Sequence, residues 1–217
     1  MFSLSHPVKG ARRSARAPFL TGLVLACTWA VLPVSGAQAA QAVVTEKPCP
    51  ETRLVQPFTS FGDGGWYSLV PGGGFEPAET RWTTAGPAMP ALGSEPYDVT
   101  GAPGWFSMAL ATGGSAQSPY MCVEPNDRTF RFFLRAAGPS AAVTVSLDYK
   151  GPLGLPVVLA SKNVTVGGGW ELSQTLHTGA ALVSNVSGGS AQLSLAFTAT
   201  KGTVRIDDVY LDPRMRR

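Results

Sequence analysis

The sequence predicts an all-β fold, an antiparallel sandwich of two sheets in a single domain after a signal peptide. The composition is the first reason: 217 residues include 25 Gly and 18 Pro, and only 14% are charged. These values exclude a long helical bundle, a coiled coil and a charged disordered chain. The second reason is that short runs of strand-forming residues alternate with Gly and Pro turns. The third is that several runs have one apolar and one polar face, which is typical of antiparallel sheets packed face to face.

Residues 1–39 have the pattern of a secretory signal peptide. A basic stretch at 9–16 precedes an apolar run at 18–34 and a small-residue stretch at 37–42. This order predicts cleavage after Ala39 or Ala42. Because the basic stretch leaves with the leader, the mature domain is close to neutral, and we expect no nucleic-acid partner.

Two other interpretations of the leader remain open. The apolar run at 18–34 is marginally long enough for an uncleaved anchor. Residues 24–27 resemble a lipobox, in which Cys27 would be acylated and become the mature N-terminus. We expect a secreted, extracellular protein without a transmembrane span in its mature form, or a lipid-anchored one through Cys27. Residues 214–217 are expected to be a solvated basic tail.

Cys49 and Cys122 are the two cysteines left after the leader. In an oxidising compartment an even pair most simply forms one disulfide, although two separate buried thiols would also fit. A zinc ribbon or a CxxC redox pair is excluded by number and spacing. The bridge would tether an N-terminal segment, residues 40–69, to a sandwich that spans residues 70–213.

The strands are predicted from runs of β-branched and aromatic residues between turns. The expected strands are 67–70, 80–84, 106–111, 120–123, 129–136, 142–149, 157–166, 170–176, 192–200 and 203–211. The clearest alternation lies at 142–149. Residues 179–187 are expected to form a short helical turn.

Three motifs resemble one family when they are taken in order. They are GGGFE at 72–76 followed by Trp82, SMALATGGSAQSP at 107–119, and VRIDDVYLD at 204–212. Together they are similar to the opening and closing strands of jelly-roll carbohydrate-binding modules of the galactose-binding-like group, as in uncharacterised secreted bacterial proteins. This chain departs from the family at Gly72, where Asn is usual, and at Arg81, where Gly is usual. The resemblance implies a jelly-roll topology.

The same resemblance implies a structural calcium ion. In the family, the motif glutamate and a motif aspartate bind it, which transfers to Glu76 and Asp207, with Asp208 as the alternative. Glu95, in a turn-like segment, is a further candidate. Strict alternation would put Asp207 on one strand face with Val209 and Leu211, and Asp208 on the other. The competing interpretation is that Asp207 pairs with an arginine such as Arg131 or Arg135, or that both aspartates lie in water at a sheet edge.

Aromatic side chains at the junctions of loops and strands suggest carbohydrate recognition. Flat rings pack on the apolar face of a sugar, and nearby polar groups fix its orientation. The candidates are Trp66, Tyr67, Trp105, Tyr97 and Tyr120, with Asp63 as a polar contact. Packing in the core is the competing role for each ring. Trp82 and Trp170 are expected to be structural.

Catalysis has little support in the sequence. His177 is the single histidine after the leader, and there is no nucleophile elbow, metalloprotease motif or dinucleotide fingerprint. Asp207 and Asp208 are neighbours on a strand and would not flank one glycosidic bond. We therefore expect a non-enzymatic protein that binds glycans outside the cell. The alternative is a structural or adhesive domain that contacts a cell-surface protein, and a small hydrolase ranks third.

Overall fold

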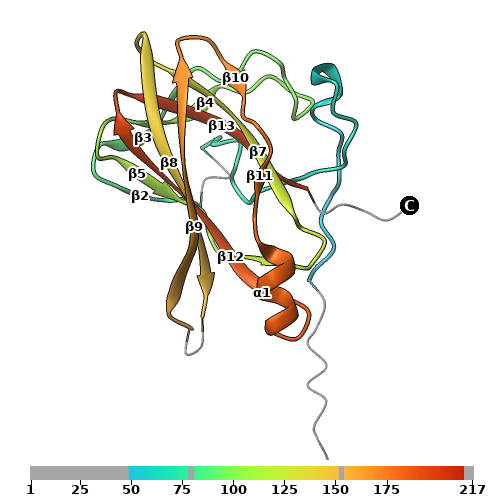
Figure 1. Ribbon diagram of the computed structural model, residues 1–217. Helices are drawn as coiled ribbons and strands as arrows, with labels where there is room; N and C mark the ends of the chain where they lie inside the picture. Colours follow the sequence, from blue (N-terminus) through green and yellow to red (C-terminus); the bar gives the residue numbers. More distant parts are fainter. Residues whose placement is uncertain (1–48, 78–80, 152–153, 213–217) are drawn as a thin grey trace, which may run out of the picture. The chain divides into compact units, whose positions relative to one another are not determined.

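The computed structural model describes residues 49–77, 81–151 and 154–212, all within one compact unit (Figure 1). The predicted leader, Cys27 and the basic tail lie outside the described residues. Two antiparallel sheets pack face to face, so the predicted all-β sandwich is confirmed. One sheet has the order β10 (Glu171–Leu172), β7 (Thr129–Ala136), β13 (Val204–Asp212), β4 (Phe106–Leu110), β3 (Ala88–Leu92), with β1 (Ser68–Leu69) beside β13 and β11 (Leu176–His177) beside β7. We call it the β13 sheet.

The other sheet, the β12 sheet, carries the longest strands. Its order is β2 (Thr83–Ala85), β5 (Ser115–Gln117), β12 (Ala191–Lys201), β8 (Ser140–Lys150), β9 (Pro156–Gly167), with β6 (Met121–Val123) also paired to β12. A 3-10 turn, η1 (Thr59–Phe61), and one short helix, α1 (Ala180–Val186), complete the described part, and α1 confirms the expected helical turn. Among the described residues, no helix has the length and apolar character needed to cross a bilayer.

The structure differs from the predicted strands in three places. β3 and β5 were not expected, because β3 contains Pro90 and β5 is three residues long. Pro90 is tolerated because β3 is an edge strand, where one missing N–H donor breaks no inner ladder. The expected strand at 170–176 is two short strands, because Ser173 interrupts it: its hydroxyl accepts a hydrogen bond from the Phe132 N–H at 3.1 Å.

The core lies between the sheets and is built from alternating inward-facing residues. On β8, Val143, Val145 and Leu147 face inward, while the intervening residues are only half-buried. Phe132 of β7 meets Phe197 of β12 edge to face at 4.9 Å between ring centroids, which joins the two sheets.

The described N-terminal segment, residues 49–70, covers the outer face of the β13 sheet. Phe58 is completely buried and packs edge to face on Tyr67 and Tyr210, at 4.9 and 5.5 Å between ring centroids. Phe133 completes this second apolar cluster. Beside it, Arg131 forms an ion pair with Asp63 at 2.9 Å. The segment is therefore part of the folded domain and not a loose extension.

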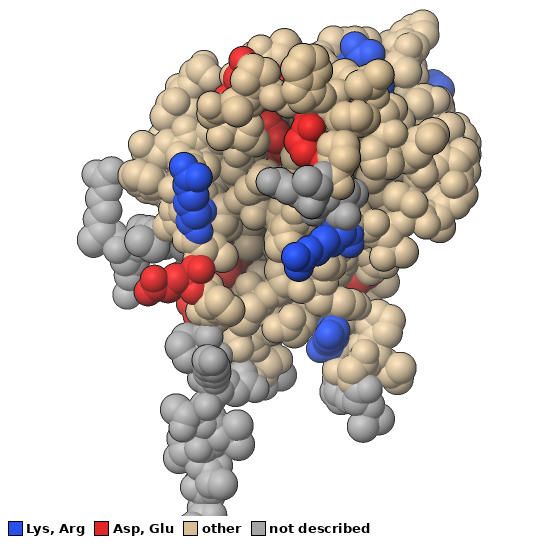
Figure 2. Space-filling view, turned by 180° about the vertical axis from the view of Figure 1, so that it is seen from behind, with Lys and Arg blue, Asp and Glu red and all other residues tan. Residues whose placement is uncertain are grey.

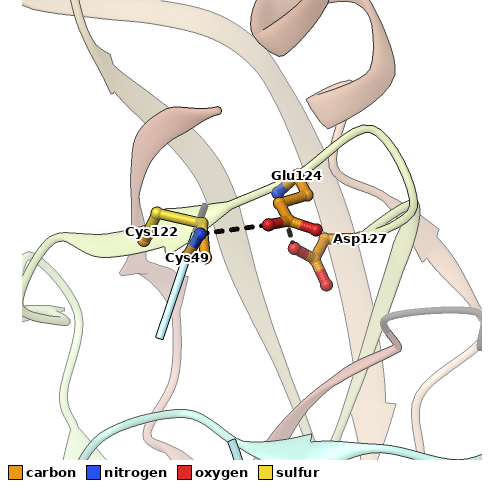
Figure 3. Close-up of a disulfide and its surroundings, with 4 residues drawn as sticks. All are labelled: Cys49, Cys122, Glu124 and Asp127. Carbon is orange, nitrogen blue, oxygen red and sulfur yellow. Dashed lines mark hydrogen bonds between the residues drawn. A yellow bond between two sulfur atoms is a disulfide. The ribbon is translucent and has the colours of Figure 1, made fainter. Parts of the chain in front are cut away.

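The predicted disulfide is present and fixes the start of this segment. Cys49 and Cys122 are bonded, with 5.5 Å between their Cα atoms (Figure 3). The Cys49 N–H donates to a Glu124 carboxylate oxygen at 3.0 Å, and the Glu124 N–H donates to Asp127 at 2.7 Å. Burial is the largest cause that raises the pKa of Asp127 to about 6. The segment is thus held by the disulfide at its start, then by Phe58 and the Asp63–Arg131 ion pair, and by the pairing of β1 with β13 at its end.

A bulge in β13 overturns the expected alternation of its side chains. The pairing of β13 with β7 shifts register between Asp207 and Tyr210, and Asp208 has a φ of 47°, in the left-handed region. As a result Ile206, Val209 and Leu211 all face the core between the sheets. The prediction that Asp207 shares a face with Val209 and Leu211 is wrong, because the bulge inserts one residue into the pattern.

Candidate functional site

Four carboxylates gather where the β13 bulge meets two loops. Asp207 and Asp208 come from the bulge, Glu95 from the β3–β4 loop, and Glu76 from the turn after the glycine run. The glycine run lies directly on β13, and a Cβ at Gly73 would be 2.9 Å from the Val209 carbonyl oxygen. Glycine is therefore required there, and this close approach positions Glu76.

Asp207 and Glu95 organise the surrounding loop. A side-chain oxygen of Asp207 accepts hydrogen bonds from the Ser94 hydroxyl at 2.7 Å and the Glu95 N–H at 2.9 Å. Glu95 in turn accepts hydrogen bonds from the N–H groups of Tyr97 and Val99. The alternative that Asp207 pairs with Arg131 or Arg135 is wrong: Arg131 pairs with Asp63, and no described Lys or Arg forms an ion pair with Asp207.

Three of the four acids, Glu95, Asp207 and Asp208, are buried, and none of the described Lys or Arg residues forms an ion pair with them. These three side chains are 4% exposed or less. Burial raises the pKa of Asp207 to about 7. Burial also raises the pKa of Asp208, and the carboxylates of Asp207, Glu95 and Glu76 raise it further. Buried carboxylates must be neutralised by protons or by a cation, because isolated buried charge is very unfavourable.

The donor chemistry fits a calcium ion, which prefers carboxylate and carbonyl oxygens. Glu76 also binds the N–H groups of Trp105 and Phe106, at 2.7 and 3.0 Å, so it faces the same loop cluster. As the side chains stand, no three Asp, Glu, His or Cys residues of the described part are placed to hold one metal ion together. Calcium therefore stays a prediction, in which backbone oxygens would supply further ligands.

A second candidate site lies on the outer face of the β12 sheet. Asp148 of β8 is half-buried, and its Oδ2 accepts a hydrogen bond from the Gln117 side chain at 3.0 Å. Its Oδ1 is buried and has no hydrogen-bond partner among the described residues. Burial raises the pKa of Asp148. Small residues, Ser194 and Ala196 of β12, lie between Gln117 and β8 in the sheet register.

Tyr120 borders this polar patch. Burial, and then the charge of Asp148, raise the pKa of Tyr120. Lys150 lies with its Nζ 4.7 Å from the centroid of the Tyr120 ring. We call Gln117, Tyr120, Asp148 and Lys150 the β12-sheet patch. The sequence identified Tyr120, but Gln117 and Asp148 were missed because outward-facing polar residues of a strand look alike before the register is known.

The other predicted carbohydrate-binding residues lie on loops around the β13 sheet. Trp105 and Trp66 are 69% and 40% exposed. Tyr97 contacts Phe61 edge to face at 4.9 Å between ring centroids. Tyr67 lies in the buried cluster with Phe58, and its hydroxyl donates to Asp63.

Asp63 and Trp82 are both held by local contacts. Asp63 accepts hydrogen bonds from the Gly65 N–H and the Tyr67 hydroxyl in addition to its ion pair with Arg131. Trp82 is buried in the main core, as expected, and its ring N–H donates to the Pro71 carbonyl at 3.1 Å.

His177 lies away from both sites, beside a pocket between the two sheets. The pocket has a volume of about 250 Å³ and is bordered by β9 and β11. Its lining includes Phe130, Leu147, Lys162 and the exposed His177. Acidic and basic side chains on the rear face of the protein are interspersed and do not form a field of one sign (Figure 2). The near-neutral charge predicted for the mature domain agrees with this distribution.

No protein-family model and no curated protein matches the sequence. Among solved structures, the chain is similar to the family 11 carbohydrate-binding module from Clostridium thermocellum in complex with a β-1,3-1,4-mixed-linked tetrasaccharide. The identity is 9%, the match covers 63% of this chain and 89% of that chain, and the TM-score is 0.38. TmCBM61 in complex with β-1,4-galactotriose is similar at 15% identity over 69% of this chain and 98% of that chain, with a TM-score of 0.37. The xylan-binding domain from CBM22 is similar at 18% identity over 69% of this chain and 96% of that chain, with a TM-score of 0.38. All three are carbohydrate-binding modules, the class that the sequence motifs resemble.

Proposed function

We propose that the protein is a secreted, non-catalytic domain that binds a glycan through the β12-sheet patch. The observation that carries the proposal is the buried Oδ1 of Asp148, which lacks a hydrogen-bond partner among the described residues and lies beside the amide of Gln117. A buried polar atom without a partner lowers the stability of the protein alone, and a ligand hydroxyl would satisfy it.

The neighbouring groups supply the rest of a sugar site. The half-exposed ring of Tyr120 offers a flat apolar surface, and Lys150 and Gln117 offer hydrogen-bond donors at its edge. Ser194 of β12 is buried under Ser118, so the ligand would lie over Gln117, Asp148 and the Tyr120 ring. A shallow site with one ring and a few fixed polar groups suits non-covalent recognition, because nothing in the patch pairs a nucleophile with a base.

Binding should depend on Asp148 and Tyr120. After a glycan array identifies a ligand for the mature domain, Asp148→Asn and Tyr120→Ala should each weaken its affinity by about tenfold or more, measured by isothermal titration calorimetry. Glu171→Gln removes an exposed carboxylate from the other sheet and should leave affinity unchanged.

The same titration tests the loop aromatics as an alternative site. If Tyr97→Ala and Trp105→Ala abolish binding while Asp148→Asn does not, the ligand binds at the β13-sheet loops and the assignment to the β12-sheet patch is incorrect. If no polysaccharide on the array binds, glycan recognition itself is refuted.

We further propose that the four-carboxylate site holds a structural calcium ion. Its support is the buried negative charge described above, which a divalent cation would neutralise. Asp207, Glu95 and Glu76 each accept hydrogen bonds from the β3–β4 loop and its junction with β4, so the ion would use their remaining lone pairs together with the Asp208 carboxylate. Its role would be to fix the β3–β4 loop against β13.

A second candidate function is docking to a cell-surface protein, and an exposed apolar surface favours it. At the edge of the β12 sheet, Leu155, Val158 and Leu159 are 64%, 63% and 45% exposed. Apolar side chains that gather on an edge strand are typical of contact surfaces. Leu155 lies before β9 and is paired with no residue of the β12-sheet patch. Leu155→Lys should therefore abolish binding to a protein partner and leave glycan affinity unchanged, which separates the two functions in a pull-down and in calorimetry.

A further inference from the structure

On the β13 sheet, two arginines face each other in register. Arg135 of β7 and Arg205 of β13 are directly paired residues, so both side chains lie on the outer face of the sheet. Like charges at opposite positions of neighbouring strands destabilise a sheet. Their proximity is also visible in the pKa of Arg205, which burial lowers first and Arg135 lowers further.

Of these two arginines, Arg205 has hydrogen-bond acceptors around its guanidinium. The Arg205 guanidinium donates hydrogen bonds to the carbonyls of Ala91, Leu92 and Gly93, at 2.7 to 2.8 Å. It also contacts the Ser107 hydroxyl. Arg205 is therefore a structural residue that fastens β3 to β13.

Arg135 has no such partners within the described part of the chain. Its Nε is buried without a hydrogen-bond acceptor, and no described carboxylate forms an ion pair with it. The side chain is half-buried, and its Nε is shielded from water. A guanidinium with a buried, unsatisfied N–H beside a second cation would be stabilised by a bound anion.

Aromatic residues border Arg135 on its other side. Its guanidinium carbon lies 5.6 Å from the centroid of the Trp170 ring. The Tyr97 hydroxyl donates to the Trp170 carbonyl at 3.2 Å, and Tyr97 contacts the exposed Phe61. A cation beside a partly exposed aromatic surface suits a ligand that has an anionic group and a ring with an apolar face. The cation would bind the anionic group, and the aromatic side chains would pack on the ring.

We propose that Arg135, Trp170 and Tyr97 form a second binding site, which binds an acidic glycan. The group that Arg135 recognises is an oxyanion on the sugar, either a uronic-acid carboxylate or a sulfate ester. The planar guanidinium would hold the oxyanion with two parallel hydrogen bonds, while Trp170 and Tyr97 would contact the sugar ring. The site lies on the sheet opposite to the β12-sheet patch, so it is independent of the glycan proposal made for that patch.

The test compares a galacturonate tetramer, a sulfated galacto-oligosaccharide and a neutral galactotetraose against the mature domain by calorimetry. We expect one of the two acidic ligands to bind, and Arg135→Gln to weaken it by about tenfold or more. Arg135→Lys, which keeps the charge but not the planar fork, should weaken it in part. Arg128→Gln, which removes an exposed arginine elsewhere, should have no effect.

Stability gives a second readout that does not depend on the choice of sugar. Without ligand and at low ionic strength, Arg135→Gln should raise the thermal midpoint, because it removes the repulsion with Arg205. Binding of neither acidic ligand, acidic binding unaffected by Arg135→Gln, or binding of the neutral ligand that Arg135→Gln weakens to the same extent would overturn the site. Loss of neutral-glycan binding in Asp148→Asn concerns only the β12-sheet patch, so the two proposals fail separately.

Discussion

Removal of the Cys49–Cys122 disulfide is expected to lower the free energy of unfolding by about 4 kcal/mol. The two cysteines are 73 residues apart, so the bond closes a long loop and strongly restricts the unfolded chain. The change is Cys49→Ala with Cys122→Ala in the mature domain, measured by urea denaturation. A drop below about 1 kcal/mol would show that the loop is not constrained by the bond.

Phe58→Ala tests a second attachment of the same segment. It is expected to cost about 3 to 5 kcal/mol by itself, because the ring is completely buried. With both changes, the segment keeps the Asp63–Arg131 ion pair and the pairing of β1 with β13 but loses its other two attachments, so the combined loss should differ from the sum of the separate losses. Strict additivity would contradict the idea that the two contacts hold one unit.

The four-carboxylate site should reverse the pH dependence of stability when calcium is added. Without calcium, the folded-state pKa of Asp207, about 7, lies above its ordinary value of 3.8. The folded state therefore binds the proton more tightly, and this contribution is fully present below about pH 4 and is lost as the pH rises through 7. The loss amounts to about 4 kcal/mol for a shift of about three units. Asp208 acts in the same direction.

With calcium the slope should change sign, because the cation binds the deprotonated carboxylates and its affinity rises with pH. The measurement is the thermal midpoint between pH 5 and pH 8, in chelator and in excess calcium. A midpoint that is the same in both solutions at pH 8 would refute calcium and leave protons as the neutralising species.

Asp208→Asn sharpens this experiment. The substitution removes one of the carboxyls whose pKa is raised in the folded state, so the midpoint in chelator should fall less steeply between pH 5 and pH 8, and the response to calcium should be abolished. Asp98→Asn is a matched control, since Asp98 also has a left-handed backbone, with a φ of 49°, but is exposed. Asn tolerates this conformation, so neither substitution strains the turn.

Much of the fold follows from the sequence because its signals are local. The alternation in β8 appears directly in the sequence, and the expected strand 142–149 lies within the observed Ser140–Lys150. The disulfide also followed, since the choice of partners was limited to Cys49 and Cys122 once the leader was removed. β3 and β5 were missed because their strand character comes from pairing with neighbours and not from their own residues.

The sites were harder to predict because they depend on register. Glu76, Asp207 and Asp208, which were predicted from the family resemblance, do converge with Glu95, which was predicted from its turn-like segment. The position of Arg205 opposite Arg135, in contrast, depends on the register between β7 and β13. These strands are far apart in the sequence, so no local pattern predicts it. The bulge at Asp208 lies where the glycine run packs on β13. A search for strictly alternating apolar and polar residues cannot detect it.

The last two strands of the chain occupy inner positions in the two sheets. β12 lies between β5 and β8, and β13 lies between β7 and β4 (Figure 1). Neither sheet can therefore close before β12 and β13 have been synthesised, because these two strands supply the central ladders. Pairing over such long sequence separations makes folding slow, and until then it leaves the neighbouring strands without their inner partners.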